Sequence, residues 1–242
     1  MIVNSLIWGG VAIFAGSLVQ GCAGFAFSLV AAPFLLFFLS QQVVIPMLVL
    51  VSMGLNVMVL KDCWSSLDFR KVLPILAGGV VTLPLGIWIL TALDPRAFRL
   101  FVGTFIILVA MVMLSGWRKP LPYSLWALGP IGMVSGILNG SLSMSGPPVV
   151  LFLTNQGTGK DEFRANLAAY FMSLNVATIS LYAFKGVLTA QVLAITGAYV
   201  PVLLVGTWLG IKVSRLLPEE VFRKITLSLI IITGAVLIGS NL

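Results

Sequence analysis

Long apolar runs, separated by short charged stretches, cover nearly the whole chain. No charged residue occurs before Lys61, and a second uncharged stretch extends from Pro120 to Gly159. A helix that spans a bilayer needs about 20 apolar residues, so each stretch is too long to be one such helix. Each stretch therefore holds more than one membrane-embedded element.

The apolar runs predict two sets of four segments, each set with one long segment followed by three ordinary spans. The expected segments lie at about 5–39, 42–60, 71–93 and 97–116, and then at about 124–156, 165–184, 188–211 and 220–240. Both long segments are interrupted near the middle by residues that break helices. These interruptions run from Gln20 to Gly24 and from Asn139 through Ser141 to Pro147 and Pro148.

The two sets also match each other in sequence, at an offset of 119 to 120 residues. The ordered matches are Gln20-Gly21 with Asn139-Gly140, Leu55-Asn56-Val57 with Leu174-Asn175-Val176, Val72-Leu73 with Val192-Leu193, and Gly86-x-Trp88 with Gly206-x-Trp208. Such an ordered series at a nearly fixed offset indicates an internal repeat. The chain is predicted to form two homologous halves of one membrane domain, residues 1–117 and 118–242.

The positive residues of the loops favour one orientation of these halves. If each long segment crossed the membrane once, the halves would be parallel, and eight positive residues on one side would oppose six on the other. If each long segment folds back as a hairpin, the halves are inverted and eleven oppose three, which is the bias expected of cytoplasmic loops. The eleven are Lys61, Arg70, Lys71, Arg118, Lys119, Lys160, Arg164, Lys212, Arg215, Arg223 and Lys224. We therefore expect inverted repeats with both termini in the periplasm.

Composition narrows the class of protein. The chain is 60% hydrophobic and 9% charged, with a mean hydropathy of +1.12, and so few charges do not cover the surface of a soluble domain. The expected fold class is an all-α polytopic membrane protein. Its start lacks the positive region of a signal peptide, so the first segment is expected to remain in the mature protein.

Charge, cysteine and histidine content exclude several partners. The net charge of +7 comes from Lys and Arg in short loops, where it orients the chain during insertion, so no nucleic-acid partner is expected. The chain has no histidine and only two cysteines, Cys22 and Cys63, so neither a metal nor another cofactor is expected.

Broken helices in inverted repeats are typical of secondary transporters, whose site lies where the half-helix ends meet. Two half-helices that begin near Cys22 and Ser141 would aim unpaired N–H groups and positive dipole ends at one point, which suits an anion. All seven acidic residues lie in loops or at span ends, which argues against a cation pump. The predicted substrate-binding residues are Gln20, Gly21, Cys22, Gly24, Asn56, Asn139, Gly140, Ser141, Ser143, Ser145, Gly146 and Asn175.

These residues also have structural interpretations. The glycines of both interruptions suit close helix packing, and Asn56 and Asn175 suit hydrogen bonds between helices as well as they suit substrate contact. Cys22 fits as a small apolar filler. Lys160 and Arg164 are interpreted as charges that orient the chain, with a minor role in drawing anions to the inner mouth.

Three stretches of the chain form a recognisable pattern: AGSLVQGCAGFAFSLVAAP at 15–33, SGILNGSLSMSGPPVVLFL at 135–153 and KDEFRANLAAYF at 160–171. They resemble the TauE/SafE sulfite exporter family. The second stretch, with its Gly-Pro-Pro, is the more specific, and the first is poorer in glycine than is usual for the family. The resemblance implies export or uptake of small sulfur-containing anions, such as sulfite, sulfoacetate or other organosulfonates, across the bacterial inner membrane.

The resulting hypothesis is a multi-pass secondary transporter or facilitator that works by alternating access and is not an enzyme. A membrane thiol-electron carrier is one alternative, but it needs paired thiols, and Cys22 is matched by Ser141. A non-transporting assembly subunit is another, although polar interruptions deep in the membrane would then be costly without evident purpose. The expected partners are a small anionic substrate and membrane lipid, with homodimer formation, transport direction and coupling ion left open.

Overall fold

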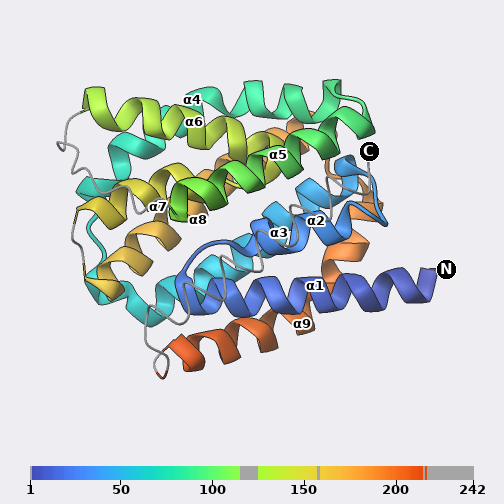
Figure 1. The fold of residues 1–242 in the computed structure, drawn as a ribbon, viewed down its shortest axis with the longest axis horizontal. Helices are drawn as coiled ribbons and strands as arrows, with labels where there is room; N and C mark the ends of the chain where they lie inside the picture. The colour runs from blue at the N-terminus through green and yellow to red at the C-terminus, as the bar shows by residue number, and fades with distance from the viewer. Residues whose placement is uncertain (1, 115–124, 157–158, 215, 217–242) are drawn as a thin grey trace.

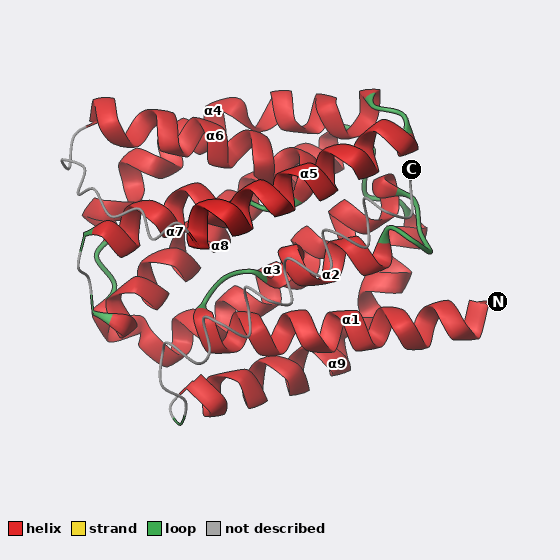
Figure 2. Cartoon of the chain, viewed as in Figure 1, coloured by secondary structure: helices red, strands yellow, loops and turns green. Residues whose placement is uncertain are grey.

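A computed structural model describes residues 2–114, 125–156, 159–214 and 216 of the chain. These residues form nine α-helices and one short 3-10 helix, with no strand among them (Figure 2). Four of the described helices are long and apolar enough to cross a membrane. The expected all-helical polytopic class is confirmed.

The first half begins with two helices joined by a short break, followed by three longer ones. They are α1 (Ile2–Ala23), α2 (Phe27–Leu35), α3 (Gln41–Cys63) with the one-turn helix η1 (Trp64–Ser66), α4 (Phe69–Ala92) and α5 (Pro95–Leu114). At 1.5 Å per residue, α1 is about 33 Å long and α2 only about 13 Å, too short to cross a bilayer. α2 packs back against α1, so the two form a hairpin.

The second half has the same order of elements. They are α6 (Leu125–Leu142), α7 (Gly146–Asn155), α8 (Lys160–Phe184) and α9 (Ala190–Ser214). α7 packs back against α6, as α2 does against α1. In Figure 1, α1 starts at the right and α6 at the left, so the two helices run in opposite directions. The last expected span, at about 220–240, lies outside the described residues.

The long first helix of each half packs against the fourth helix of the other half. α1 contacts α9 along one edge of the molecule and α6 contacts α4 along the opposite edge (Figure 1). Between these pairs, α3 and α8 contact each other, and each also contacts the fourth helix of the other half. The halves are therefore interlocked rather than stacked side by side.

Glycines allow the two edge pairs to come into backbone contact. A Cβ placed on Gly86 of α4 would lie 2.4 Å from the carbonyl oxygen of Ile137, and one on Gly210 of α9 would lie 2.3 Å from that of Leu18. Both distances are far shorter than a relaxed Cβ contact, so any larger side chain would push the helices apart. Small residues at such contacts are typical of helix pairs in membranes.

The same contacts correct the sequence alignment of α4 with α9. The Cβ position of Gly86 lies 3.0 Å from the Cα of Gly140, and that of Gly210 lies 3.0 Å from the Cα of Gly21. Gly21 and Gly140 are matched in the sequence alignment of the two halves, so Gly86 corresponds in packing to Gly210, and its predicted match to Gly206 is wrong by about one helical turn. A shift of one turn keeps the same helix face toward its neighbour, so the apolar pattern does not reveal it.

The first break lies later than the sequence predicts. α1 continues through Gly21, and the next helix begins at Phe27 rather than near Cys22. Gly21 stays helical because its place is against the backbone of α9, where a glycine is needed for packing. The chain turns instead at Gly24 and Ala26, whose φ angles of 81° and 77° are left-handed.

The second break is displaced in the same direction. α6 continues through Gly140 and Ser141, and α7 begins at Gly146, so the prediction of a half-helix that begins near Ser141 is wrong. Gly140 packs against α4 as Gly21 packs against α9. Here the turn is made by Ser143, whose φ of 57° is left-handed. In both breaks, the prediction took a glycine that packs against another helix for a residue that ends its own helix.

Side chains are distributed as a lipid environment requires. Large apolar side chains face outward from the long helices, for example Leu73, Val81, Trp88, Leu193 and Trp208. The amides of α1 and α6 and of the two central helices are buried instead, namely Gln20, Asn139, Asn56 and Asn175. A bilayer is therefore the solvent of the outer surface, and the polar chemistry is inside.

Candidate functional site

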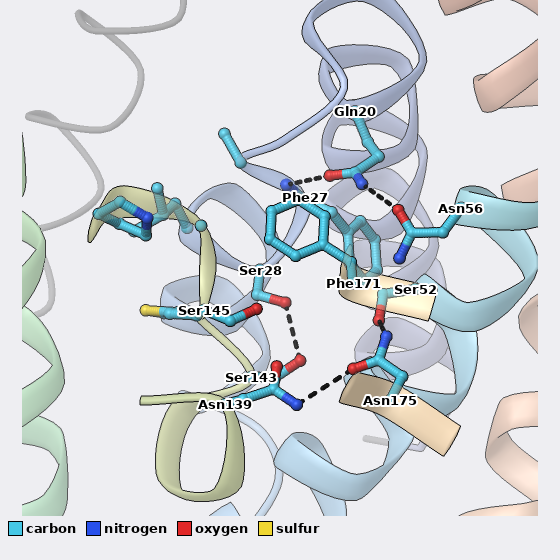
Figure 3. A pocket seen from close by; sticks show the side chains of 15 residues that line it. Gln20, Phe27, Ser28, Ser52, Asn56, Asn139, Ser143, Ser145, Phe171 and Asn175 are labelled. Atoms are coloured by element: carbon cyan, nitrogen blue, oxygen red, sulfur yellow. Dashed lines mark hydrogen bonds between the residues drawn. The ribbon is translucent and has the colours of Figure 1, made fainter. Parts of the chain in front are cut away.

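The two breaks meet α3 and α8 around a small cavity (Figure 3). Its volume is about 30 Å³, roughly twice what one water needs. None of the described residues that line it is charged. They are Gln20, Ala26, Phe27, Ser28, Leu29, Ser52, Asn56, Asn139, Ser143, Met144, Ser145, Gly146, Pro147, Phe171 and Asn175.

In the first half, Gln20 connects the break to α3. Its Nε2 donates to Asn56 Oδ1 at 2.8 Å and to the carbonyl oxygen of Gly24 at 3.3 Å. The backbone N–H of Phe27 donates to Gln20 Oε1 at 3.2 Å. Because a backbone N–H can only donate, this bond fixes which end of the Gln20 amide faces Phe27 and which faces Asn56.

In the second half, the equivalent pair is Asn139 and Asn175. Asn139 Nδ2 donates to Asn175 Oδ1 at 3.2 Å and to Thr178 Oγ1 at 2.8 Å. Asn175 Nδ2 donates to Ser52 Oγ at 2.8 Å, across the interface between α8 and α3. Each half thus pairs an amide on its first helix with an amide on its third helix, and Figure 3 shows the two pairs along the same cavity.

Serine hydroxyls join the two breaks to each other and to α6. Ser28 Oγ, at the start of α2, donates to Ser143 Oγ in the second break at 3.1 Å. Ser135 Oγ donates to the carbonyl oxygen of Ser145 at 2.6 Å and accepts from the Tyr170 hydroxyl at 2.8 Å. The breaks are therefore held in one hydrogen-bonded arrangement around the cavity.

The first residues of α2 and α7 line the cavity, so two helix N-termini converge on it. First-turn N–H groups have no acceptor within their own helix, and the N-terminal end of a helix carries partial positive charge. In α2, the Phe27 N–H is used by Gln20, while those of Ser28 and Leu29 belong to the same first turn. In α7, Pro147 and Pro148 have no N–H, so its first turn offers fewer donors.

A buried arginine supports the first break, although the sequence predicts for it an orienting charge with a minor role in drawing anions to the inner mouth. Arg164 is 3% exposed, and its Nη2 donates to the carbonyl oxygen of Gly21 at 3.0 Å. Its Nη1 forms an ion pair with Asp62 Oδ2 at 3.0 Å. Arg164 does not line the cavity but packs on the turn, with its Cγ 3.3 Å from the Cβ position of Gly24. Its place at the edge of an apolar run gave no signal that distinguishes it from other loop charges.

Seven of the twelve predicted binding residues line the cavity. They are Gln20, Asn56, Asn139, Ser143, Ser145, Gly146 and Asn175. The prediction omitted the other eight lining residues, among them Ser28, Ser52 and Phe171. The sequence does indicate Ser52 as a lining residue, because it lies one helical turn before Asn56 and so faces the same side of its helix.

The other five predicted residues lie outside the cavity lining. Gly21 and Gly140 face α9 and α4, and Gly24 makes the turn beneath Arg164. The Ser141 hydroxyl donates to the carbonyl oxygen of Ile137 in its own helix at 2.7 Å. Cys22 is buried with a free thiol.

The fold and the site together define a polytopic, all-helical membrane protein in which two broken helices meet at an uncharged polar cavity. Residues 8–237 match the sequence profile of the family described as Sulfite exporter TauE/SafE. The match covers nearly the whole chain, and the chain belongs to this family. Membership places the protein among transporters rather than enzymes. No curated protein and no solved structure matches the chain at a significant level.

Proposed function

We propose that this protein carries small sulfur oxoanions, such as sulfite or a short organosulfonate, across the inner membrane, and binds them in the cavity between the breaks. One observation carries the proposal: the N-termini of α2 and α7 line the same uncharged, donor-rich cavity in a chain of the sulfite exporter family.

The lining chemistry supports an anion rather than a cation. Helix N-termini favour negative charge, and the amide and hydroxyl groups of the cavity supply N–H and O–H donors from several directions. No carboxylate lines the cavity among the described residues, whereas sites for cations and protons in membranes usually contain one. A sulfite or sulfonate group presents three oxygens to such donors and needs no buried arginine beside it.

The proposal includes two inverted halves that move against each other to expose the cavity to one side at a time. The opposite directions of α1 and α6 support this inversion (Figure 1). So do two ion pairs, Arg164 with Asp62 and Lys71 with Glu162, which join the start of α8 to the end of α3 and the start of α4. Inverted halves place these charges together on the cytoplasmic side, and parallel halves do not. Opening of that side requires these pairs to separate.

The test is the thermal stability of the purified protein in detergent with sulfite, sulfoacetate, methanesulfonate, sulfate and acetate. A ligand that binds only the folded state raises the midpoint, and above its Kd the rise grows with the logarithm of the ligand concentration. We expect sulfite or the sulfonates to raise it, and the double variant Gln20→Ala/Asn139→Ala to lose the effect. Ser180→Ala is the matched control, because Ser180 is exposed on α8 and bonds only its own helix at Val176. No midpoint shift with any anion would contradict the proposal.

A further inference from the structure

One amide donor at the cavity has no partner among the described residues. Asn56 is 1% exposed, and its Nδ2 is buried without a hydrogen-bond acceptor. The orientation of its amide follows from a chain of contacts, because Phe27 fixes Gln20 and the Nε2 of Gln20 then requires the Oδ1 of Asn56. A buried donor left without an acceptor is costly, so such a group in a binding site suggests that a ligand satisfies it.

The equivalent donor in the second half is occupied. Asn175 Nδ2 donates to Ser52 Oγ at 2.8 Å, and Ser52 in turn donates to the carbonyl oxygen of Val49 at 3.0 Å. At the repeat offset of 119 residues, the position that corresponds to Ser52 is Phe171. The hydroxyl that holds Asn175 is thus replaced, on the Asn56 side, by a phenyl ring that has no acceptor lone pair to offer the amide.

Phe171 belongs to the wall of the cavity. Its side chain lines the cavity, and its Cζ lies 3.5 Å from the Cβ position of Gly146, the first residue of α7. The ring therefore lies beside one of the two helix N-termini that favour an anion. Figure 3 shows Phe171 on the same side of the cavity as Asn56 and Phe27.

From this asymmetry we infer that Asn56 is the specificity-determining donor of the site, and that its Nδ2 donates to an oxygen of the bound anion. Asn175 is held by Ser52 as a fixed part of the wall, and Phe171 keeps the Asn56 amide available. Both halves place an amide at the same position of the framework, but the amide of Asn56 contacts the substrate and the amide of Asn175 holds the wall of the cavity. This inference rests on the proposed anion site and adds which of the two matched amides contacts the substrate.

The test compares two matched variants, Asn56→Leu and Asn175→Leu, by sulfite-dependent thermal stability and by calorimetric titration with sulfite. A hydrogen bond to a charged group is worth roughly 10- to 100-fold in affinity, and we expect Asn56→Leu to lose about that factor. Its midpoint without anion should change little, because the lost bond to Gln20 is offset by removal of an unpaired donor. Asn175→Leu should lower the anion-free midpoint but keep most of the affinity. Equal losses of affinity in both variants, or none in Asn56→Leu, would overturn the inference.

A second pair of variants tests the role of Asn56 if the proteins with leucine substitutions do not fold. Phe171→Ser introduces a hydroxyl at the position equivalent to Ser52, and we expect it to bind the Asn56 amide and to weaken sulfite binding by about tenfold. Ser52→Ala frees the Asn175 amide and should leave the affinity unreduced. The opposite order of these two variants would overturn the inference. If wild-type protein responds to no anion, the proposed function fails and the inference with it; if wild type responds and Phe171→Ser responds equally, only the inference fails.

Discussion

The two breaks have the same framework but are held by different chemistry. The first break is held by a charged group, because Arg164 donates to the carbonyl oxygen of Gly21 and is paired with Asp62. In the second, a neutral relay runs from the Tyr170 hydroxyl through Ser135 to the carbonyl oxygen of Ser145. Both solutions satisfy backbone groups that a broken helix leaves free inside a membrane, where each unpaired group is costly.

This difference shows that the two breaks have the same need, hydrogen bonds to free backbone groups, and meet it with different side chains. A charged support also connects the first break to the charged loops at one end of the molecule, which the neutral relay does not. We therefore expect the first break to be the more sensitive to substitution, and the following variants test that order.

The largest effect is expected for Arg164→Leu. Arg164 and Asp62 have side chains only 4% and 14% exposed, so Arg164→Leu takes away the ion-pair partner of a largely buried carboxylate. The cost of breaking such a pair is about 3–5 kcal/mol, measured as a fall in the free energy of unfolding or a large drop in the thermal midpoint. Asp62→Asn combined with Arg164→Leu should recover part of it. Lys61→Ala, at an exposed position of the same end, is the control, and an equal effect there would contradict the account.

The next effect concerns the close helix contacts that both halves share. Gly210→Ala places a Cβ 2.3 Å from the carbonyl oxygen of Leu18, and overpacking of this kind costs about 1–3 kcal/mol. Gly197→Ala, in the same helix with nothing within 4 Å, should be stabilising by up to about 1 kcal/mol. Gly206→Ala, whose nearest contact is the Cβ of Ser17 at 2.9 Å, should lie between them. A larger cost at Gly206 than at Gly210 would contradict the packing equivalence of Gly86 and Gly210.

A smaller effect is expected for Tyr170→Phe, which removes one donor from the neutral relay. Ser135 keeps its own bond to the carbonyl oxygen of Ser145, so only one hydrogen bond of about 1 kcal/mol is lost. The thermal midpoint should fall much less than in Arg164→Leu. A fall as large as that of the arginine variant would show that the two supports are equally important.

The smallest effect is expected at a surface carboxylate that contrasts with the buried ion pair. Backbone N–H groups of Ala97 and then Arg96 donate to Asp94 at the start of α5 and lower the pKa of its carboxyl. A lowered pKa contributes stability that is present above the ordinary pKa of Asp and is lost as pH falls through the lowered one. Asp94→Ala should therefore reduce the midpoint slightly at neutral pH, with the difference disappearing in acid. A difference that persists below the lowered pKa would contradict this cause.

Much of the fold could be predicted because the apolar pattern is strong. Uncharged stretches longer than one span, with polar interruptions at matched positions, were enough to predict the paired helices on each side of both breaks. The exact position of each break could not be predicted, because a glycine can either end a helix or permit close helix packing. Gly21 and Gly140 permit close packing. The register of α9 was missed for a related reason, since Gly206 and Gly210 lie on the same helix face.

The lining of the candidate cavity was predicted in part, and the residues that the prediction missed share one feature. Gln20, Asn56, Asn139 and Asn175 were found because each polar residue has a matched partner in the other half. Arg164 and Phe171 have no such partner, since the repeat places other residue types at their equivalent positions. Comparison of halves finds what the repeat preserves, and only the three-dimensional contacts show how the halves differ.

The most direct test of the account is uptake of radiolabelled sulfite into liposomes that contain the purified protein. We expect saturable uptake that methanesulfonate inhibits, that is lost in Gln20→Ala/Asn139→Ala and that is retained in Ser180→Ala. Uptake by the double variant at the wild-type rate would show that the anion does not pass through the cavity between the breaks, and would contradict the central claim.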